Sequence, residues 1–510
     1  MVLISRFAND RKQSMASIRN RHSYSVGALL SLSFLLVFLV AWTSVAQQSD
    51  RAKQPALGPP PVLKLPVIQH LTLSNGLKVV LMEKHDVPLV QMELIVMVGS
   101  VNDPLAQGGL ASMTSALMDE GAGGRTSLQL ADAIDYLGAS ISPSMGFHTS
   151  GVSVHTPLSK LDSALALAAD IALRPTFPAE ELERQRKQRL TTLIQWHDDA
   201  RSIVSALYDK LLFGEAHPYG RPAIGSEEAI RGFQPSDLKK FHSTYYSPSN
   251  ATIVVVGDVT ASSILPKLER QFGKWKGRSV VPPKWPTAHQ VEERKIYFVD
   301  KPGAAQSEIR IGRLGVSRLT EDFYALEVLN TILGGSFTSR LNQNLREQHG
   351  YSYGASSSFA FRPLPGPFTA RAAVQTDVTD KALTEFMKEL ANIMQPVSDE
   401  ELTRAKNYLA LGYPGNFESV SQVAGQLIDL TIYNLPDSYF NSYIQKVFAV
   451  SKDDVLRAAK KYLDPEKVNI VIVGDRAKVE AGVKALEIAP VHFFTIDDVL
   501  GPAPVMDSND

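Results

Sequence analysis

The amino-acid sequence predicts an α+β fold of two duplicated domains, each a mainly antiparallel sheet covered by helices. The first observation is that "YYSPSNATIVVVGDVT" near residue 250 returns as "KYLDPEKVNIVIVGDRA" near residue 470. Each copy follows a similar helical segment, "PSDLKKFHSTY" or "KDDVLRAAKKY", and "PAEELERQRK" echoes "VSDEELTRAKN" further upstream. Similarity spread over so much sequence indicates a duplicated domain, because a solenoid has more and shorter repeats. The matching positions, 217 residues apart (462 minus 245), are Tyr245, Pro248, Gly257 and Asp258 with Tyr462, Pro465, Gly474 and Asp475.

The first domain, expected over 68–276, begins with a β-hairpin. The segment "HLTLSNGLKVVLMEK" contains two apolar runs separated by Asn75 and Gly76, a pair typical of hairpin turns. Further strands are predicted at "VQMELIVMVGS" and "GVSVHTP", and one long helix at "PAEELERQRKQRLTTLIQWHDD". Because this helix carries charges on several faces, we interpret it as solvated.

Proline marks the ends of the domains. Residues 47–67, which include "QPALGPPPVLKLP", predict a tether without a core of its own. The stretch "GRSVVPPKWPTAHQ" lacks periodicity and predicts a linker over 277–292. The second domain is therefore expected over 293–490, followed by a C-terminal tail over 491–510.

The composition excludes several classes of function. The 510 residues are 44% hydrophobic and 21% charged, with a net charge of −1, so nothing indicates a nucleic-acid partner. The chain has no cysteine, which excludes a disulfide framework, a thiolate metal site and a cysteine nucleophile.

The N-terminus predicts export. A basic stretch precedes the apolar run "VGALLSLSFLLVFLVAW", residues 26–42, and small residues follow up to Ala46. This pattern predicts a signal peptide over 1–46, cleaved after Ala46, and a periplasmic protein. The alternative is an uncleaved membrane anchor, since the run matches the shortest spanning helices of about 17 residues. Translation from Met15 rather than Met1 would give a signal of more usual length.

The stretch "GLASMTSALMDEG", residues 109–121, predicts a helix that closes on glycine. Its apolar residues Leu110, Met113 and Leu117 recur at helical spacing. The other face carries small side chains that neither bind a metal ion nor accept a proton at neutral pH. They are Ser112, Ser115 and Ala116.

Four segments carry a resemblance to a known family. They are "LSNGLKVVLMEKHDVPLVQMELIVMVGS", "GGLA", "HPYGRPAIGSEEAI" and "LNTILGGSFTSRLNQNLREQHGYSYGASSSF". With them the chain resembles the pitrilysin/insulinase-type (M16) metallopeptidases over about residues 68 to 490. The resemblance implies a two-domain chain that forms half of a clamshell and pairs face to face with a second chain.

The resemblance also implies a lost zinc motif. In this family the helix after "GGLA" carries His-x-x-Glu-His, in which the histidines bind zinc and the glutamate activates a water molecule; a glutamate on the long helix is the third ligand. No metal site is therefore expected in this chain, and zinc is expected in the partner chain. The eleven histidines include no pair three or four apart, so the remaining alternative is a site assembled from distant residues. The lost motif positions are Ser112, Ser115, Ala116 and Thr192.

The second half keeps its part of the family's site. The family pairs zinc with an arginine and a tyrosine from the opposite half of the molecule, and "LREQHGYSY" places them at Arg346 and Tyr353. Arginine offers a fixed fork of donors for a carbonyl group, and a tyrosine hydroxyl can donate to an oxyanion. The preceding "LGGSFTSRL" resembles the family's glycine turn, with Gly334 and Gly335 as expected substrate-binding positions.

Two hypotheses of function follow. The first is a non-catalytic subunit of a heterodimeric zinc-dependent oligopeptidase, which donates Arg346 and Tyr353 to a sister subunit that bears the zinc motif. Its substrates would be short peptides, bound as an added strand. The alternative is a catalytically inactive structural or peptide-binding scaffold of the same fold, in which the pair persists through packing.

Overall fold

The computed structural model describes Gly58 and residues 62–506. Contacts divide the chain into Met1–Pro59 and Pro60–Asp510, and all helices and strands named below belong to the second unit. The predicted signal peptide over 1–46 and its membrane-anchor alternative lie outside the described residues. Within the described part, no helix is long and apolar enough to cross a bilayer.

The first sheet has six strands, joined by antiparallel pairs except for the parallel pair β2–β8. Its first two strands form the predicted hairpin, in which Gly76 adopts a φ of +85° that glycine accepts without strain. In spatial order the strands are β1(Ile68–Thr72), β2(Lys78–Glu83), β8(Ala251–Gly257), β3(Leu89–Val96), β7(Ser150–Pro157) and β6(Ser140–Met145).

The helices of the first half, except the one over residues 200–213, pack their apolar residues against this sheet. Helix α9, for example, buries Ile264, Leu268 and Phe272, which recur every four residues and so share one face. The helices are α2(Leu110–Ala116), α3(Ser127–Leu137), α4(Leu161–Leu173), α5(Ala179–Asp198), α6(Ala200–Phe213), α7(Glu227–Gly232), α8(Pro235–Tyr245) and α9(Ala261–Phe272).

Helix α2 is shorter than the sequence predicts. The pattern over 109–121 indicated a helix closing on glycine, whereas α2 ends at Ala116 and Gly121 begins the short strand β4(Gly121–Ala122). The two amides after the helix donate to carbonyl groups three positions back, which tightens the last turn and ends the helix.

Helix α5 is not the solvated helix that its charges suggested. One of its faces is buried, and Arg186 on that face is only 6% exposed. The Arg186 guanidinium donates to the carbonyl oxygens of Ile230 and Phe233, the second at 2.7 Å. A buried charge is tolerated when it is hydrogen-bonded, and these acceptors come from a distant part of the chain.

The second sheet also has six strands, and five of them repeat the topology of the first sheet. The sixth, an edge strand, pairs in parallel with its neighbour, whereas β1 pairs antiparallel with β2. Strand β13 pairs in parallel with β9 and antiparallel with β10, as β8 does with β2 and β3. The segment expected as a C-terminal tail contributes β14 and helix α18(Ile496–Leu500). In spatial order the strands are β11(Ser352–Phe359), β12(Pro367–Gln375), β10(Gln306–Leu314), β13(Asn469–Gly474), β9(Lys295–Asp300) and β14(Val491–Phe494).

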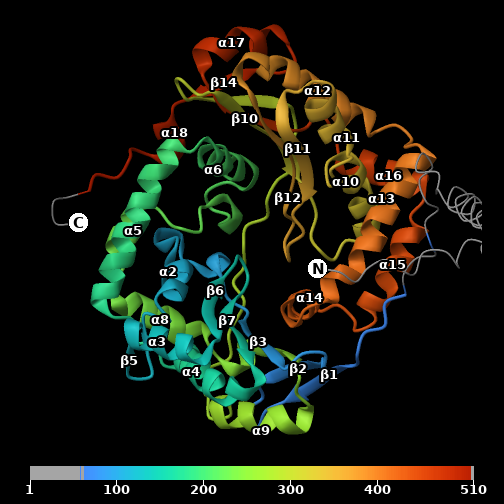
Figure 1. Cartoon of the computed structure of the whole chain (residues 1–510). Coiled ribbons are helices and arrows are strands. Elements are labelled where there is room, and N and C mark those ends of the chain that lie inside the picture. The colour runs from blue at the N-terminus through green and yellow to red at the C-terminus, as the bar shows by residue number, and fades with distance from the viewer. Residues whose placement is uncertain (1–57, 59–61, 507–510) are drawn as a thin grey trace, which may run out of the picture. The chain divides into compact units, whose positions relative to one another are not determined.

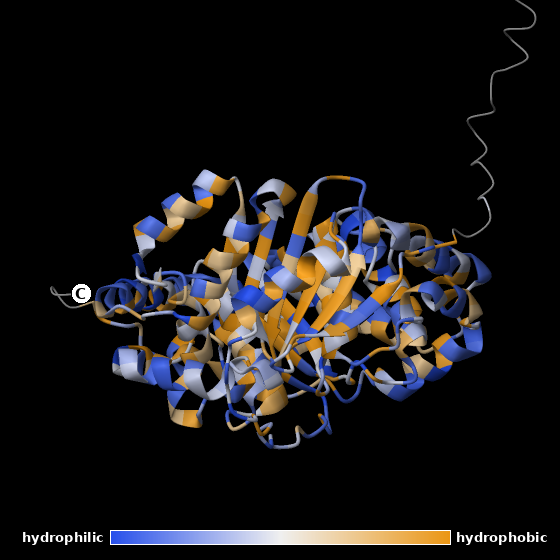
Figure 2. Cartoon of the chain, turned by 90° about the horizontal axis from the view of Figure 1, so that it is seen from below, coloured by the Kyte–Doolittle hydropathy of each residue, from blue (hydrophilic) through white to orange (hydrophobic). Residues whose placement is uncertain are grey.

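The helices of the second half complete an α+β fold, and Figure 2 shows the apolar strands between helices with polar stripes. The predicted fold class, two helix-covered sheets of mainly antiparallel strands, is confirmed. The helices are α10(Phe323–Leu333), α11(Arg340–Asn342), the π-helix η6(Gln343–Gln348), α12(Thr379–Asn392), α13(Asp399–Gly412), α14(Val420–Ile432), α15(Tyr439–Ala449), α16(Lys452–Tyr462) and α17(Arg476–Ala485).

Each half supplies one helix to the sheet of the other. Helix α14 of the second half packs on β3 and β8, and helix α6 of the first half packs on β10 and β13 (Figure 1). The hydroxyl of Tyr208 on α6 donates to the Phe368 carbonyl oxygen at 2.7 Å, and Ser421 on α14 donates to Gln91 at 2.8 Å. Because α6 crosses to the second sheet, it brings charged residues of the first half to that sheet's open face.

Candidate functional site

Arg346 and Tyr353 lie on neighbouring elements at the edge of the second sheet. Arg346 is on the π-helix η6, with its guanidinium 4.5 Å from the Phe337 ring centre and its Nε 3.4 Å from a carboxylate oxygen of Glu347. Tyr353 stands at the start of the edge strand β11 and is 92% exposed. No hydrogen bond joins these two described side chains, so the segment presents both without fixing one against the other.

The two predicted glycines hold the strand that carries Tyr353. The Gly334 carbonyl accepts from the Ser357 amide at 3.1 Å, and a Cβ at Gly334 would overlap that amide nitrogen. A Cβ at Gly335 would come within 2.7 Å of the Asn330 side-chain nitrogen. Glycine at 334 therefore lets the end of α10 approach β11 closely, and glycine at 335 lets the chain turn back against α10. Their expected role in substrate binding stays a prediction.

A cavity of about 430 Å³ opens beside Tyr353 on the face of the second sheet. Arg346 does not line it. The charged side chains on its lining were not predictable from the sequence, because they come from three separate elements, α6, β10 and β12. The lining residues are Arg201, Gln306, Glu308, Arg310, Ser352, Tyr353, Gly354, Ser356, Arg371, Ala372 and Ala373.

In the first half, Ser112 on α2 is hydrogen-bonded within the protein. Its hydroxyl donates to the carbonyl oxygen of Ala223 at 2.8 Å and lies 3.0 Å from that of Gly109. The guanidinium of Arg189, from helix α5, donates to the Ser112 oxygen at 2.7 Å and to the Ile224 carbonyl at 3.2 Å. Burial lowers the pKa of Arg189 to about 10, so the side chain remains cationic at neutral pH.

Asp103 fixes the N-terminus of the same helix. Its carboxylate accepts from the amides of Gly109 and Ala111 at 2.8 and 2.7 Å, two donors that an isolated helix would leave unpaired. The side chain is only 8% exposed, and this burial raises its pKa to about 7, against the opposing effects of the hydrogen bonds and of Arg221 and Arg189.

The other predicted motif positions are also non-ligating. Ser115 is buried, Ala116 has no polar group, and the Thr192 hydroxyl donates to the Gln188 carbonyl on its own helix at 2.9 Å. Around Ser112 the structure offers hydroxyl, carbonyl and guanidinium groups. Within residues 62–506, no group of three or more His, Asp or Glu side chains is arranged to hold a metal ion.

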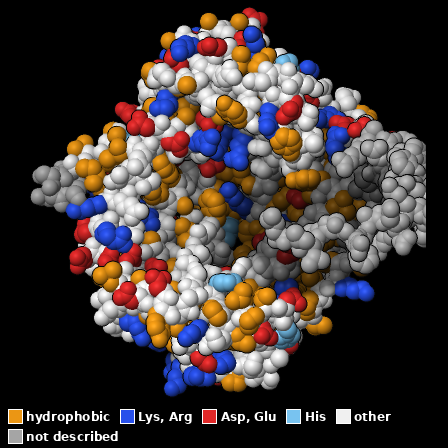
Figure 3. All heavy atoms as spheres, in the orientation of Figure 1, with side chains coloured by type: hydrophobic (Ala, Val, Ile, Leu, Met, Phe, Trp, Pro, Cys, Tyr) orange, Lys and Arg blue, Asp and Glu red, His pale blue; other side chains and the backbone are white. Residues whose placement is uncertain are grey.

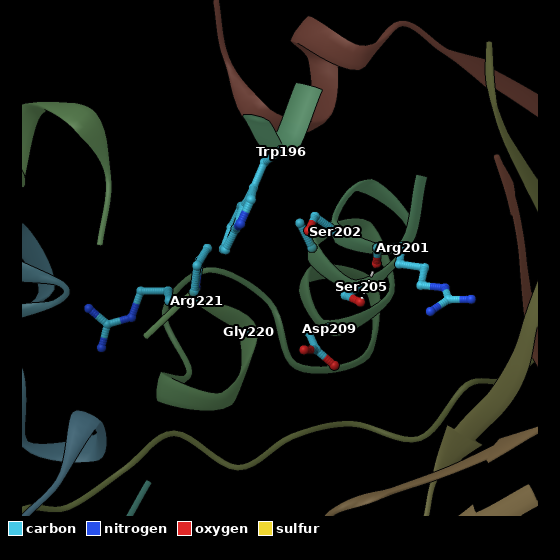
Figure 4. Close-up of a pocket in the computed structure, with 9 residues that line it drawn as sticks. Trp196, Arg201, Ser202, Ser205, Asp209, Gly220 and Arg221 are labelled. Carbon is cyan, nitrogen blue, oxygen red and sulfur yellow. Dashed lines mark hydrogen bonds between the residues drawn. The ribbon is translucent and has the colours of Figure 1, made fainter. Parts of the chain in front are cut away.

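A second cavity, of about 250 Å³, lies between α5 and α6 and is drawn in Figure 4. Trp196 forms one wall, and Arg201 and Arg221 point away from each other on opposite sides. Burial raises the pKa of Asp209 to about 6, although Arg362 and Arg310 oppose this shift. Arg201 lines both cavities.

Comparison with known proteins identifies one peptidase family along most of the chain. The family model described as Insulinase (Peptidase family M16) matches residues 78–212, and that described as Peptidase M16 inactive domain matches residues 232–409. Zinc protease PqqE of Helicobacter pylori is 24% identical over 454 residues, covering 86% of this chain and 96% of that protein. An uncharacterized zinc protease of Mycobacterium leprae is 27% identical over 343 residues, covering 67% and 76%.

Solved structures agree with this assignment. The peptidase M16 inactive domain from Pseudomonas fluorescens matches with a TM-score of 0.75 at 27% identity, covering 80% of this chain and 98% of that chain. The first half of the periplasmic protease PqqL from Escherichia coli matches with a TM-score of 0.67, covering 84% and 97%; at 17% identity it shows the fold alone. The chain belongs to the M16 peptidase (insulinase) family and carries both its N-terminal and its C-terminal domain.

Proposed function

We propose that the chain is the non-catalytic subunit of a heterodimeric zinc-dependent oligopeptidase and donates Arg346 and Tyr353 to the active site of a zinc-bearing partner. The observation that carries the proposal is the contrast between the two halves. Ser112, at a position where the family has a zinc ligand, is held by internal hydrogen bonds, whereas Tyr353 is 92% exposed.

The groups around Ser112 do not fit a zinc ion. Zinc sites in proteins use histidine, cysteine and carboxylate ligands, and none of these is supplied by Ser112, Ser115, Ala116 or Thr192. The Arg189 guanidinium adds a positive charge at 2.7 Å from the Ser112 oxygen, which opposes a divalent cation. Peptide hydrolysis by this chain alone is therefore not expected.

Arg346 and Tyr353 suit the task of binding the substrate carbonyl and its oxyanion. Activation of the attacking water would be the task of the partner's zinc. Arg346, held only by a ring contact and a weak pairing with Glu347, is free to turn its donors toward a substrate carbonyl. The Tyr353 hydroxyl would donate to the oxyanion that forms as the carbonyl is attacked. The names of the homologous zinc proteases support peptide hydrolysis as the reaction class.

The proposal places the protein in the periplasm, following the signal peptide predicted over 1–46. Its partner would be an M16 sister subunit with an intact His-x-x-Glu-His motif. Short peptides would be the substrates, and membrane attachment would follow only if the N-terminal segment is not cleaved.

The test is peptide hydrolysis by the purified chain, by the zinc-motif protein encoded nearest to it, and by their mixture, with zinc measured in each. The proposal expects zinc in the partner and cleavage by the mixture alone. The double variant Arg346→Ala with Tyr353→Phe should abolish cleavage. The matched control, Arg278→Ala with Tyr136→Phe, alters an exposed arginine and an exposed tyrosine elsewhere and should leave it unchanged.

An inactive mixture, or a double variant as active as the control, would reject the catalytic role. The chain would then be the scaffold of the alternative hypothesis, with Arg346 retained through its contact with Phe337. Stoichiometric zinc in this chain would contradict the assignment of the Ser112 position.

A further inference from the structure

Two arginines lie side by side on neighbouring strands of the second sheet. Arg310 on β10 is the direct antiparallel partner of Arg371 on β12. Both lie on the open face, because their neighbours along the strands, Ile309 and Ile311 or Ala370 and Ala372, are buried on the opposite face. Like charges directly opposite each other in a ladder destabilise a sheet, so this pairing calls for a compensating interaction.

The protein itself supplies little compensation. Neither guanidinium has an ion-pair partner within 4.0 Å among the residues that the structure describes. The Arg371 Nε makes one long contact, 3.4 Å, with the Ser356 hydroxyl, and Arg310 donates no side-chain hydrogen bond to a described residue. A guanidinium carries five N–H donors, so most of the donors in this pair have no acceptor among the described residues.

A third guanidinium reaches the same cavity from the first half. Arg201 on α6 pairs with Glu308 at 3.1 Å, and Figure 4 shows Arg201 directed away from Trp196. The cavity lining thus has three guanidinium groups and one carboxylate, which leaves two positive charges unbalanced. Asp209, about two turns along α6 from Arg201, influences Arg310 through space but does not line this cavity.

The surroundings leave room for a ligand. The rest of the lining consists largely of small side chains such as Ser356 and Ala373, and the cavity of about 430 Å³ has Tyr353 on its lining. Figure 3 shows Lys and Arg side chains gathered on this face, where Figure 1 draws α6, β10 and β11.

We propose that this cavity, with Arg310 and Arg371 as its main donors, binds a carboxylate group of a peptide. The carboxylate is either an Asp or Glu side chain or the peptide's C-terminus. Two adjacent guanidinium groups match the two oxygens of a carboxylate, and charge-assisted hydrogen bonds of this kind are among the strongest in proteins. That the ligand is a peptide rests on the proposed function; that it is a carboxylate rests on the cavity.

Because Tyr353 lines the same cavity, a carboxylate bound there anchors the peptide next to the group proposed to contact its reacting carbonyl. The subunit would therefore select acidic peptides, or peptides cleaved near their C-terminus, for the partner's active site. The inference adds a specificity determinant to the proposed function and needs no partner chain to be tested.

The experiment is calorimetric titration of the full chain, without a partner, with four unlabelled alanine-rich peptides. One pair differs by a single central Glu or Gln, both with blocked ends; the other pair differs by a free or an amidated C-terminus. The expected result is binding of the Glu peptide, the free-acid peptide or both at least about tenfold more tightly than of the neutral counterpart. Which pair shows the difference identifies the source of the carboxylate.

Variants then assign the binding to the cavity. Arg310→Gln and Arg371→Gln should each remove the preference, while Arg278→Gln, on an exposed arginine outside the cavity, should keep it. Thermal melts establish that each variant is folded. Equal binding of acidic and neutral peptides, or a preference that survives both cavity substitutions, would overturn the proposal.

The outcome is separable from that of the proposed function. The variant Arg346→Ala should keep the preference for a carboxylate, because Arg346 does not line the cavity. If the mixture with the zinc-bearing chain is inactive but the preference is present, the catalytic role fails and the carboxylate site stands.

Discussion

Helix α2 of the first half and the η6–β11 segment of the second half are the two regions that the family resemblance marks as functional, and they are opposite in character. The side chain of Ser112 on α2 is bonded to Ala223 and Arg189. Tyr353 on β11 is 92% exposed, and Arg310 and Arg371, which line the cavity beside it, have no ion-pair partner among the described residues. A region whose polar groups are satisfied internally has no donors left for a ligand. This contrast is the basis on which we propose that the second half carries the function of the chain.

The largest effect should come from Tyr353. We expect Tyr353→Phe to lower kcat of the mixed peptidase by about 100- to 1,000-fold with little change in KM, because the lost donor acts on the oxyanion rather than on bound substrate. Steady-state kinetics of the reconstituted pair measures this. Since the side chain is exposed, the melting temperature should not change. A loss confined to KM would mean that Tyr353 only binds substrate.

The second-largest effect should be on the pH dependence of the free energy of unfolding, through Asp103 at the N-terminus of α2. Burial raises the pKa of Asp103 to about 7 from 3.8. For an acid with a raised folded-state pKa, the stabilisation is present below the unfolded value and is lost as pH rises through the folded value. The difference in unfolding free energy between the native chain and Asp103→Asn should therefore fall by about 2 to 4 kcal/mol from pH 4 to pH 8. Urea unfolding at three pH values tests this; a constant difference would contradict the assignment.

The third prediction concerns zinc binding in the first half, which we expect the buried guanidinium of Arg189 to oppose. A variant with Ser112→His, Ser115→Glu, Ala116→His and Thr192→Glu restores the family's motif residues but keeps the buried guanidinium. We expect it to bind zinc about 100-fold more weakly than the same variant with Arg189→Met, because the positive charge lies where the metal would bind. Zinc titration with a competing chelator measures the ratio. Equal affinities would show that Arg189 moves aside at no cost.

The fold was predictable from the sequence because it depends on patterns along the chain. The repeat that ends in Gly257 and Gly474 identified two equivalent domains, and five strands of each sheet share one topology. The site residues that the sequence proposes, Arg346 and Tyr353, come from one contiguous motif, and their role stays a prediction. Arg189 looked like one more charge on a solvated helix, because its acceptors, Ser112 and Ile224, come from elsewhere in the chain.

The cavity arginines escaped prediction for a related reason. Arg310 and Arg371 become neighbours only through the register of β10 against β12, and α6 reaches the same sheet from the first half. A single arginine in an alternating strand is ordinary and carries no signal by itself. Arg310 and Arg371 become recognisable as a pair only once the strand register places them opposite each other on adjacent strands.

The smallest predicted effect is on the stability of that pair. If the two guanidinium groups are kept together for a ligand, their repulsion costs free energy in its absence, and removing one should stabilise the chain. We expect Arg371→Gln to raise the unfolding free energy by about 0.5 kcal/mol, in contrast to the loss expected for the hydrogen-bonded Arg189→Met of about 2 kcal/mol. Urea unfolding of both variants makes the comparison, and added salt should shrink the gain because it screens the repulsion. A destabilised Arg371→Gln would mean that the pair has a structural role, and the contrast between a closed first half and an open second half would then rest on Tyr353 alone.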